Sequence, residues 1–325
     1  MDKKIKIIKN RSDLGAGTRG SDMGIDAIEI AAINKGSDFF SLYQFKDVAT
    51  VNEAIYNKQK AKFAFRIENV LKVCTNLAID VKDAITEDFF PIVISGDHSS
   101  ALGTISGIKM AHPNKRLGVV WIDAHADVHS PYTTPSGNIH GMPLSAALAD
   151  NNLDRKINNL TADTDKHWEA MKSIGGIAPK IVADDLIYFG VRDTEESEDY
   201  FIEKNNIKNY KVAEVRYRGM EVCLQESFEK LKDCDHIYIS FDVDSMDCDL
   251  ISKGTGTPVS KGFDQEEIIQ IIKGFIDTKK VASVEIVEVN PCLDTKGNKM
   301  AETAFEVLES ITDTIEKNLS LNQNL

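Results

Sequence analysis

Histidines and aspartates gather in three short motifs of this 325-residue chain. Five of its seven histidines fall in the stretch from His98 to His140. The first motif is SGDHS at Ser95–Ser99, the second is DAHAD at Asp123–Asp127, and the third is DVD at Asp242–Asp244. Each follows a run of apolar residues, which predicts burial. Buried carboxylates and imidazoles at this density need a neutralising partner, so the motifs predict a cation site.

The spacing inside the motifs predicts that their side chains converge. Residues i, i+2 and i+4 of an extended strand point to one face, which would bring Asp123, His125 and Asp127 together. With the third motif and the histidine of the first, the set holds four aspartates, two histidines and no thiolate, which is too oxygen-rich for one tetrahedral zinc ion. The predicted metal ligands are His98, Asp123, His125, Asp127, Asp242 and Asp244.

Two hard or borderline cations fit this ligand set better than one. Carboxylate-rich ligation with some imidazole favours manganese, with Co²⁺, Ni²⁺ or Fe²⁺ as substitutes. Two metal ions roughly 3.5–4 Å apart can share a water and lower its pKa toward neutrality. The motifs therefore predict metal-assisted hydrolysis.

The elements that must position these motifs are short apolar strands alternating with amphipathic helices. The predicted strands are 4–8, 90–95, 117–122, 186–190, 236–241 and 281–289, and the predicted helices are 61–79, 224–232, 265–277 and 302–316. This alternation predicts an α/β protein, a three-layer α/β/α fold with a mostly parallel central sheet. Ligands bind beyond the carboxyl ends of such strands, so the three motifs should meet at one edge of the sheet.

The chain shows no linker, no long charge run and no internal repeat, which predicts one domain over residues 1–325. The polar stretch 150–185 is predicted to be a surface insertion with a short helix around 166–174. Residues 318–325 are predicted to form a flexible tail.

The charge and the cysteines narrow the classes of partner and compartment. The chain has 38 Lys plus Arg against 51 Asp plus Glu, a net charge of −13, which argues against a nucleic-acid partner. No stretch approaches the roughly 18 apolar residues of a membrane span, and the N-terminus lacks the apolar core of a signal peptide. Five scattered cysteines predict reduced thiols in the cytoplasm.

The motifs resemble those of the ureohydrolases, the arginase and agmatinase family. The matching segments are SGDHS at 95–99, WIDAHAD at 121–127, SFDVD at 240–244 and EVNP at 288–291. The resemblance extends from the glycine-rich segment 15–24 to the final helix. It implies an arginase-like fold, a small-molecule guanidino substrate and a homo-oligomer, either a trimer or a hexamer. The segment TTPSGNIHG at 133–141 resembles the arginase loop that binds the α-amino acid end of the substrate, which favours L-arginine.

The resemblance also implies roles for individual residues. One manganese would be bound by His98, Asp123, Asp127 and Asp242, and the other by Asp123, His125, Asp242 and Asp244. A hydroxide bridging the two ions would convert L-arginine to L-ornithine and urea. Asp127 would accept a hydrogen bond from the hydroxide, Glu288 would orient the guanidinium group and His140 would transfer protons. The implied substrate-binding residues are His129, Ser136, Asn138, Glu195, Glu198 and Thr257.

The sequence departs from the family pattern at three places, and two of them are compatible with a different substrate. His129 stands where arginases have Asn, and Glu195 stands where the family usually has Asp. The segment 245–253 replaces a Gly-Leu-Asp-Pro run and is one residue longer, which predicts a shifted loop without loss of a metal ligand. The first two departures suggest another guanidino substrate, such as agmatine, guanidinobutyrate or a modified arginine.

Two further alternatives belong to different classes of protein. One is a catalytically silent family member that serves as a binding subunit. The other is a zinc deacylase of the related histone deacetylase type, in which a single zinc ion would leave His98 and Asp244 without a role.

Overall fold

The computed structural model describes residues 4–58 and 60–322, and one eight-stranded sheet runs through them. The strand order is β2-β1-β3-β8-β7-β4-β5-β6, and all seven neighbouring pairs are parallel. The strands are β1 (Ile5–Asn10), β2 (Gln44–Asp47), β3 (Phe90–Ser95), β4 (Leu117–Ile122), β5 (Leu186–Phe189), β6 (Lys208–Tyr210), β7 (His236–Asp242) and β8 (Val281–Val287). The predicted three-layer α/β/α fold is confirmed, and the sheet is entirely parallel in the described part of the chain.

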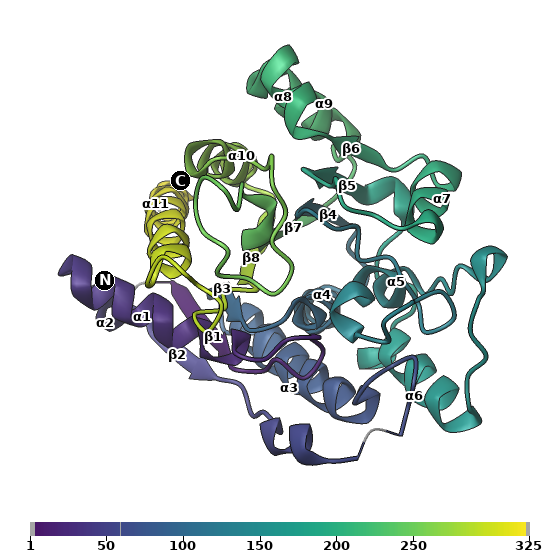
Figure 1. Ribbon diagram of the computed structural model, residues 1–325. Helices are drawn as coiled ribbons and strands as arrows, with labels where there is room; N and C mark the ends of the chain where they lie inside the picture. Colours follow the sequence, from purple (N-terminus) through teal and green to yellow (C-terminus); the bar gives the residue numbers. More distant parts are fainter. Residues whose placement is uncertain (1–3, 59, 323–325) are drawn as a thin grey trace.

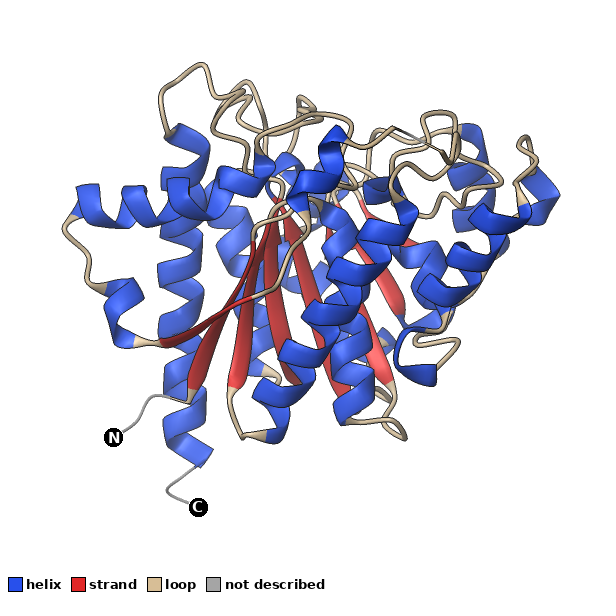
Figure 2. Ribbon diagram, turned by 90° about the horizontal axis from the view of Figure 1, so that it is seen from below, coloured by secondary structure: helices blue, strands red, loops and turns tan. Residues whose placement is uncertain are grey.

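Helices cover both faces of the sheet (Figures 1 and 2). The α-helices are α1 (Gly24–Lys35), α2 (Phe39–Leu42), α3 (Ile67–Thr86), α4 (Ala101–Ala111), α5 (Pro143–Leu148), α6 (Ala162–Lys172), α7 (Glu196–Lys204), α8 (Val212–Arg218), α9 (Met220–Lys230), α10 (Gln265–Asp277) and α11 (Lys299–Asn322). Short 3-10 helices are η1 (Ser21–Met23), η2 (Asn52–Tyr56), η3 (His98–Ser100), η4 (Ile139–Gly141), η5 (Leu153–Arg155), η6 (Ile174–Gly176), η7 (Ala183–Asp185) and η8 (Val243–Ser245). Helices α1, α10 and α11 lie on one face, and α3 to α6 lie on the other.

The strands are continuous apolar runs because alternate residues serve two cores. In β3, Ile92 and Ile94 pack into the core with α1, α10 and α11, whereas Val93 packs into the core with α3 and α4. When a strand is covered on both faces, neither set of alternate side chains meets solvent, so polar and apolar residues do not alternate along it. All of these side chains are fully buried.

Some predicted bounds were wrong, and several elements gave no clear sequence signal. Helix α3 begins at Ile67, so residues 61–66 are not helical, and it continues to Thr86. Helix α4 is buried nearly all round, so it lacks the amphipathic pattern used to find helices. Its Gly107 lets α3 approach closely, since a Cβ there would lie 2.7 Å from the Ala78 carbonyl oxygen. Strands β2 and β6 are short sheet edges without an apolar run.

The segment 150–185 contains η5, α6, η6 and η7, and α6 covers most of the predicted short helix around 166–174. Its role as an insertion stays a prediction. The predicted flexible tail begins inside α11, which continues to Asn322, and residues 323–325 lie outside the described residues. No described helix is long and apolar enough to span a membrane.

The strands that carry the chemical motifs are neighbours at the centre of the sheet. In the order β3-β8-β7-β4, β3 leads to His98, β8 to Glu288, β7 to Asp242 and β4 to Asp123. Loops gather at this carboxyl edge (Figure 2). Parallel pairing therefore brings together segments that are almost 200 residues apart along the chain, since His98 and Glu288 are separated by 190 positions.

Candidate active site

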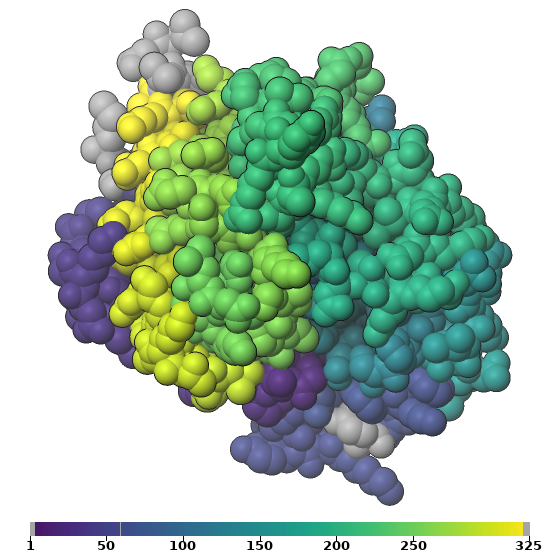
Figure 3. Space-filling model, turned by 45° about the horizontal axis from the view of Figure 1, so that its top comes forward, coloured from purple at the N-terminus to yellow at the C-terminus, as the bar shows by residue number. Residues whose placement is uncertain are grey.

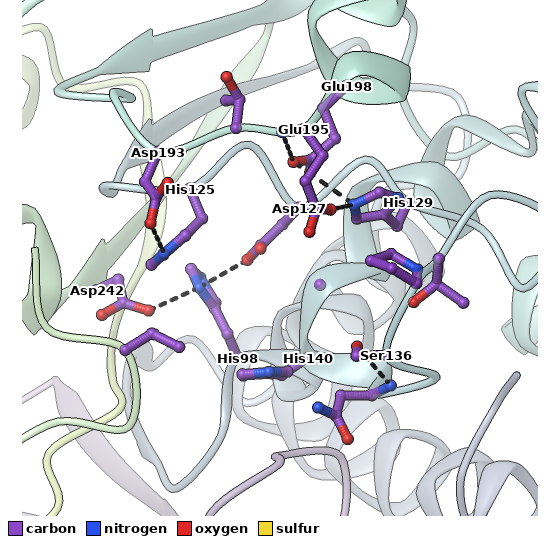
Figure 4. Close-up of a pocket in the computed structure, with 16 residues that line it drawn as sticks. His98, His125, Asp127, His129, Ser136, His140, Asp193, Glu195, Glu198 and Asp242 are labelled. Carbon is purple, nitrogen blue, oxygen red and sulfur yellow. Dashed lines mark hydrogen bonds and ion pairs between the residues drawn. The ribbon is translucent and has the colours of Figure 1, made fainter. Parts of the chain in front are cut away.

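A cavity of about 250 Å³ opens at the carboxyl edge of the central strands. On this side of the molecule the N-terminal (purple), middle (teal) and later (green) parts of the chain adjoin (Figure 3). The cavity is lined by His98, His125, Asp127, His129, Thr134, Pro135, Ser136, Asn138, His140, Gly141, Asp193, Thr194, Glu195, Glu198, Asp242 and Thr257 (Figure 4).

His98 forms the centre of the first ligand cluster. Its Nδ1 lies 3.0 Å from Asp123 Oδ2, 3.1 Å from Asp127 Oδ2 and 3.0 Å from Asp242 Oδ2. Although Nδ1 is buried, no described residue forms a hydrogen bond with it. The ring is held from elsewhere, because Nε2 contacts Ser240 Oγ at 2.7 Å and the ring stacks on Trp121 with centroids 4.1 Å apart.

His125 forms the second cluster with Asp123 and Asp244. His125 Nδ1 lies 3.1 Å from Asp244 Oδ2 and 3.4 Å from Asp123 Oδ1. Asp123 therefore takes part in both clusters, one carboxylate oxygen facing each histidine. Thr257 Oγ1 donates a hydrogen bond to Asp244 Oδ2 at 2.9 Å, which fixes that carboxylate. Asp244 keeps this place although the segment 245–253 departs from the family pattern.

The side chains of the DAHAD motif converge for a different reason from the predicted one. Strand β4 ends at Ile122, so the motif is not extended. The backbone N–H of His125 donates to Asp123 Oδ1 at 2.7 Å, and Asp127 has a positive φ of 51°. A left-handed backbone is uncommon for a residue other than glycine and is often found at functional sites. The turn after the strand, not the pleat of the strand, aims these groups.

The charge balance of the two clusters calls for cations. Burial, together with the charges of Asp244 and Asp123, raises the pKa of Asp242 well above its usual range. Burial would lower the pKa of His98, but the three aspartates that lie close to its Nδ1 raise that pKa well above its usual value. Four buried carboxylates thus face two imidazoles. The Nδ1 of His98, which has no hydrogen-bond partner among the described residues, and this oxygen-rich donor set fit two divalent ions.

Glu288 lies directly beside the first cluster. Its Oε1 accepts hydrogen bonds from the His98 backbone N–H and from His140 Nδ1, both at 3.0 Å. Its Oε2 is also buried, but no described residue forms a hydrogen bond with it. Burial alone would lower the pKa of His140, but the contact with Glu288 raises it to about 8. Glu288, like Asp127, has a positive φ, here 66°.

His129, Glu195 and Glu198 form a third polar group on the opposite wall (Figure 4). His129 Nε2 contacts Glu195 Oε2 directly and lies 3.6 Å from Glu198 Oε2. Burial would lower the pKa of His129, but the hydrogen bond to Glu195 and the charge of Glu198 raise it. Burial raises the pKa of Glu198 to about 7. The two glutamates also form the capping box of α7, so the start of that helix fixes both of them.

Ser136 and Asn138 reach the cavity from the loop before η4. Ser136 Oγ accepts a hydrogen bond from the Asn138 backbone N–H at 3.2 Å. Gly137 between them has a φ of 82°, and a Cβ there would lie 2.5 Å from the Lys62 carbonyl oxygen. Its own carbonyl accepts from the Phe65 N–H at 2.8 Å. The SGN step therefore requires glycine, and the segment before α3 supports the loop.

Sequence reasoning missed several residues that shape this site. Asp193 lines the cavity, and its Oδ2 lies 3.7 Å from His125 Nε2. Its position two residues before Glu195 is the sequence feature that could have identified it as a site residue. Arg192 donates to the backbone carbonyls of six residues, among them Asp244 and Val259, and so holds the loop that carries Asp244. No sequence signal predicted that role.

Comparisons with known proteins agree with this geometry. The model of the arginase family matches residues 3–312. The arginase of Bacillus subtilis (strain 168) is 36% identical over 313 residues, which cover 96% of this chain and 98% of that protein. A crystal structure of Bacillus caldovelox arginase superimposes with a TM-score of 0.79 at 34% identity, covering 95% of this chain and 98% of the other. Entamoeba histolytica arginase in complex with L-ornithine gives a TM-score of 0.81 at 28% identity, covering 96% and 99%.

The resemblance that the motifs indicated is thereby confirmed over almost the whole chain. The matched region contains all three polar motifs and the EVNP segment. Proteins of this family are hydrolases of amidine C–N bonds that use a binuclear metal site, and the two clusters around Asp123 are groups that could hold metal ions. The chain is a member of the arginase family.

Proposed function

We propose that this protein hydrolyses the guanidinium group of L-arginine to L-ornithine and urea, with two Mn²⁺ ions per chain. The observation that carries the proposal is Oε2 of Glu288, which is buried beside the His98 cluster and has no hydrogen-bond donor among the described residues. A buried carboxylate oxygen without a donor is costly, and a guanidinium group offers several N–H donors.

The metal ligands in this proposal are those of the two clusters. His98, Asp127, Asp123 and Asp242 would hold one ion, and His125, Asp244, Asp123 and Asp242 would hold the other. The ions would supply a water that is activated at neutral pH and positive charge to stabilise the transition state. The donor set favours Mn²⁺, with Co²⁺, Ni²⁺ or Fe²⁺ as substitutes.

The remaining catalytic roles fall to Asp127, Glu288 and His140. Asp127 lines the cavity and accepts a hydrogen bond from the attacking water. Glu288 Oε2 accepts a guanidinium N–H, which aims the guanidinium carbon at that water. His140, whose pKa is raised to about 8, carries a proton at neutral pH and transfers it toward the leaving amine.

The other end of the cavity provides groups for an amino acid. Ser136 and Asn138 offer a hydroxyl and an amide to the substrate carboxylate, and Glu195 and Glu198 offer acceptors to its ammonium group. Thr257 also lines the cavity and donates a hydrogen bond to Asp244. The structure of the related Entamoeba histolytica arginase is a complex with L-ornithine, which supports an amino acid as the ligand of this family member.

A second candidate is hydrolysis of another guanidino compound, such as agmatine, guanidinobutyrate or a modified arginine. The contact between His129 Nε2 and Glu195 favours this candidate, because it engages a carboxylate that would otherwise receive the substrate ammonium. His129 is larger than the Asn of the family pattern and reduces the space at that end of the cavity.

The silent-subunit and zinc-deacylase alternatives differ from both candidates in metal content. A single zinc would leave one of the two clusters without an ion, although His98 and Asp244 are each buried among potential ligands. Two ions per chain support an enzyme of the proposed type. One zinc ion favours the deacylase, and no bound metal after reconstitution favours the silent subunit.

A substrate panel tests the proposed function. The metal-depleted protein is reconstituted with Mn²⁺, and urea release is measured with arginine, agmatine and guanidinobutyrate. Arginine should give the highest kcat/KM. No urea from arginine by protein that carries two Mn²⁺ per chain contradicts the proposal, and release from another compound in the panel selects the second candidate.

We also propose that residues 1–325 form one domain, with 150–185 as a surface insertion. The family resemblance supports a homo-oligomer, a trimer or hexamer, which light scattering coupled to size-exclusion chromatography would measure. Five free thiols are in keeping with a reducing compartment such as the cytoplasm.

A further inference from the structure

His129, Glu195 and Glu198 form a third group of potential metal ligands, apart from the two clusters that share Asp123 (Figure 4). One ring nitrogen of the histidine and one oxygen of each glutamate all lie within 4.8 Å of one another. His129 Nε2 lies 3.6 Å from Glu198 Oε2 and contacts Glu195 Oε2 directly. With metal–ligand bonds of about 2.1 Å, two ligands of a tetrahedral ion lie about 3.4 Å apart. His129 and Glu198 therefore have nearly the separation that one ion requires.

The imidazole of His129 is held so that Nε2 faces the two glutamates. Its other ring nitrogen, Nδ1, lies 3.2 Å from Thr133 Oγ1 and 3.3 Å from Ser197 Oγ. The side chain is nearly buried. A polar partner on the far nitrogen fixes the ring of a metal-binding histidine in the same way. The Asn of the family pattern has no imidazole nitrogen, so this ligand arises from a departure that distinguishes the chain.

The two glutamates combine a fixed ligand with an adjustable one. Glu198 is buried, and its Oε2 accepts a hydrogen bond from the Glu195 backbone N–H at 3.2 Å. The side chain of Glu195 is 55% exposed, so it can rotate to share an ion with the other two residues. No lysine or arginine is among the described residues that line the cavity. Two carboxylates thus face one imidazole, an arrangement that a cation would stabilise.

We propose that His129, Glu195 and Glu198 bind one Zn²⁺ ion that excludes the amino-acid end of the substrate. One imidazole nitrogen and two carboxylate oxygens leave the fourth position of a tetrahedral zinc open toward the cavity. Such a site binds Zn²⁺ more tightly than Mn²⁺, so it would stay free of the metal of the two clusters until zinc is present. The ion would occupy both carboxylates that the proposed function assigns to the substrate ammonium. The inhibitory effect rests on that proposed function, whereas zinc binding rests on the three residues alone.

The first experiment measures zinc binding without substrate. Protein reconstituted with Mn²⁺ is dialysed against Zn²⁺, and both metals are determined in the protein. Wild type should take up one Zn²⁺ per chain and keep its manganese. His129→Asn removes one of three ligands and should weaken zinc binding at least 10- to 100-fold, the loss expected from removing even an outer-shell partner. His167→Asn is the matched control, because His167 lies on α6 beside Asp163 and outside the active-site cavity.

A second ligand variant guards against misfolding of the first. Glu195→Gln changes a half-exposed side chain, keeps its shape and removes its charge, so it should also lose zinc. Zinc uptake equal to wild type in Glu195→Gln and in every folded sample of His129→Asn overturns the inference. Loss of one Mn²⁺ for each Zn²⁺ bound overturns it as well, because the zinc would then lie in one of the two clusters around Asp123.

The second experiment measures urea release at increasing zinc. At ten times its dissociation constant, Zn²⁺ should raise the apparent KM for arginine about tenfold in wild type and leave kcat unchanged. His129→Asn should show no such rise over the same zinc concentrations. An unchanged KM in wild type that carries the third ion overturns the inhibitory role.

The two experiments separate this inference from the proposed function. If arginine gives no urea but wild type binds a third ion that His129→Asn loses, the proposed substrate is wrong and the zinc site stands. If arginine is hydrolysed and the two proteins take up zinc alike, the zinc site is wrong and the proposed function stands.

Discussion

Glu288 and His140 share a hydrogen bond that uses only one of the two oxygens of the glutamate. His140 Nδ1 lies 3.0 Å from Oε1, which also accepts the His98 backbone N–H. The other oxygen, Oε2, has no donor among the described residues. Burial would raise the pKa of Glu288, but the His140 contact lowers it, so the group is a carboxylate at neutral pH. One oxygen of Glu288 thus contacts the segment of a proposed metal ligand and a proposed acid–base group, and its other oxygen keeps its acceptor capacity among the described residues.

Glu288→Gln should lower kcat/KM for the preferred guanidino substrate by about 100-fold, because a charge-assisted hydrogen bond contributes about 3 kcal/mol. Metal content should remain two ions per chain, since Glu288 is not a proposed ligand. Steady-state urea release and metal analysis measure the two quantities. Glu229→Gln, an exposed change on α9, is the control and should leave both unchanged. Wild-type kcat/KM in Glu288→Gln would contradict the assigned role.

His140→Asn should lower kcat by about 10²–10⁴-fold if the imidazole transfers a proton in the rate-limiting step. The value is read from kcat against pH, and added imidazole should restore part of the rate. A fall in substrate affinity with unchanged kcat would instead assign His140 to binding.

His140 should also make the stability of the metal-depleted protein depend on pH. Its pKa is about 8 in the folded chain, against about 6.5 for an unperturbed histidine. Its contribution is therefore fully present below pH about 6.5 and is lost as the pH rises through about 8. Urea unfolding at pH 6 and pH 9.5 should show a stability difference between wild type and His140→Asn that is larger at pH 6 by about 2 kcal/mol. A difference that does not change with pH would rule out this linkage.

His129→Asn should raise kcat/KM for arginine by roughly tenfold and leave kcat/KM for agmatine unchanged. The substitution frees Glu195 to accept a hydrogen bond from the substrate ammonium group. A hydrogen bond to a charged group contributes about 1.5 kcal/mol or more. The ratio of the two kcat/KM values is the measurement. A lower arginine-to-agmatine ratio would show that His129 itself binds the substrate carboxylate.

Removal of metal by a chelator should abolish urea release and lower the unfolding temperature. Without the ions, four buried aspartates lie close together beside two histidines. Burial of these carboxylates is unfavourable, as the raised pKa of Asp242 indicates. Each ion at 100 times its dissociation constant stabilises the folded state by about 2.7 kcal/mol. Calorimetry before and after addition of Mn²⁺ measures the difference. An unfolding temperature that does not respond to chelation would argue against a bound pair of ions.

The parts of the fold that could be predicted were those with strong apolar patterns. The bounds of β3, β4 and α10 were predicted correctly, because their runs are long and end in polar residues or caps. Helix α4 was missed because it is buried on nearly every side, and β2 because its four residues are all exposed. Hydrophobic periodicity arises where one face of an element meets the core and the other meets solvent. Helix α4 is buried on nearly every side and β2 is exposed throughout, so neither shows it.

The site could be predicted in part for the same reason. The aspartates and histidines of the three motifs stand out because buried charge must be balanced, and the cavity brings most of them together. The contacts of Glu285 with Ser95 and Tyr238 could not be predicted, because the three residues lie on β8, β3 and β7 and only strand register aligns them.

The sequence by itself was enough to predict the oxygen-rich ligand set, the parallel α/β architecture and the family, and the last two predictions are confirmed. Tertiary structure alone decided how those groups are oriented. It paired His129 with Glu195, left Glu288 Oε2 without a donor in the described part of the chain and turned His98 Nδ1 toward three aspartates. Residue types and local patterns follow from the covalent chain, but hydrogen-bond direction depends on neighbours that the parallel sheet brings from almost 200 residues away.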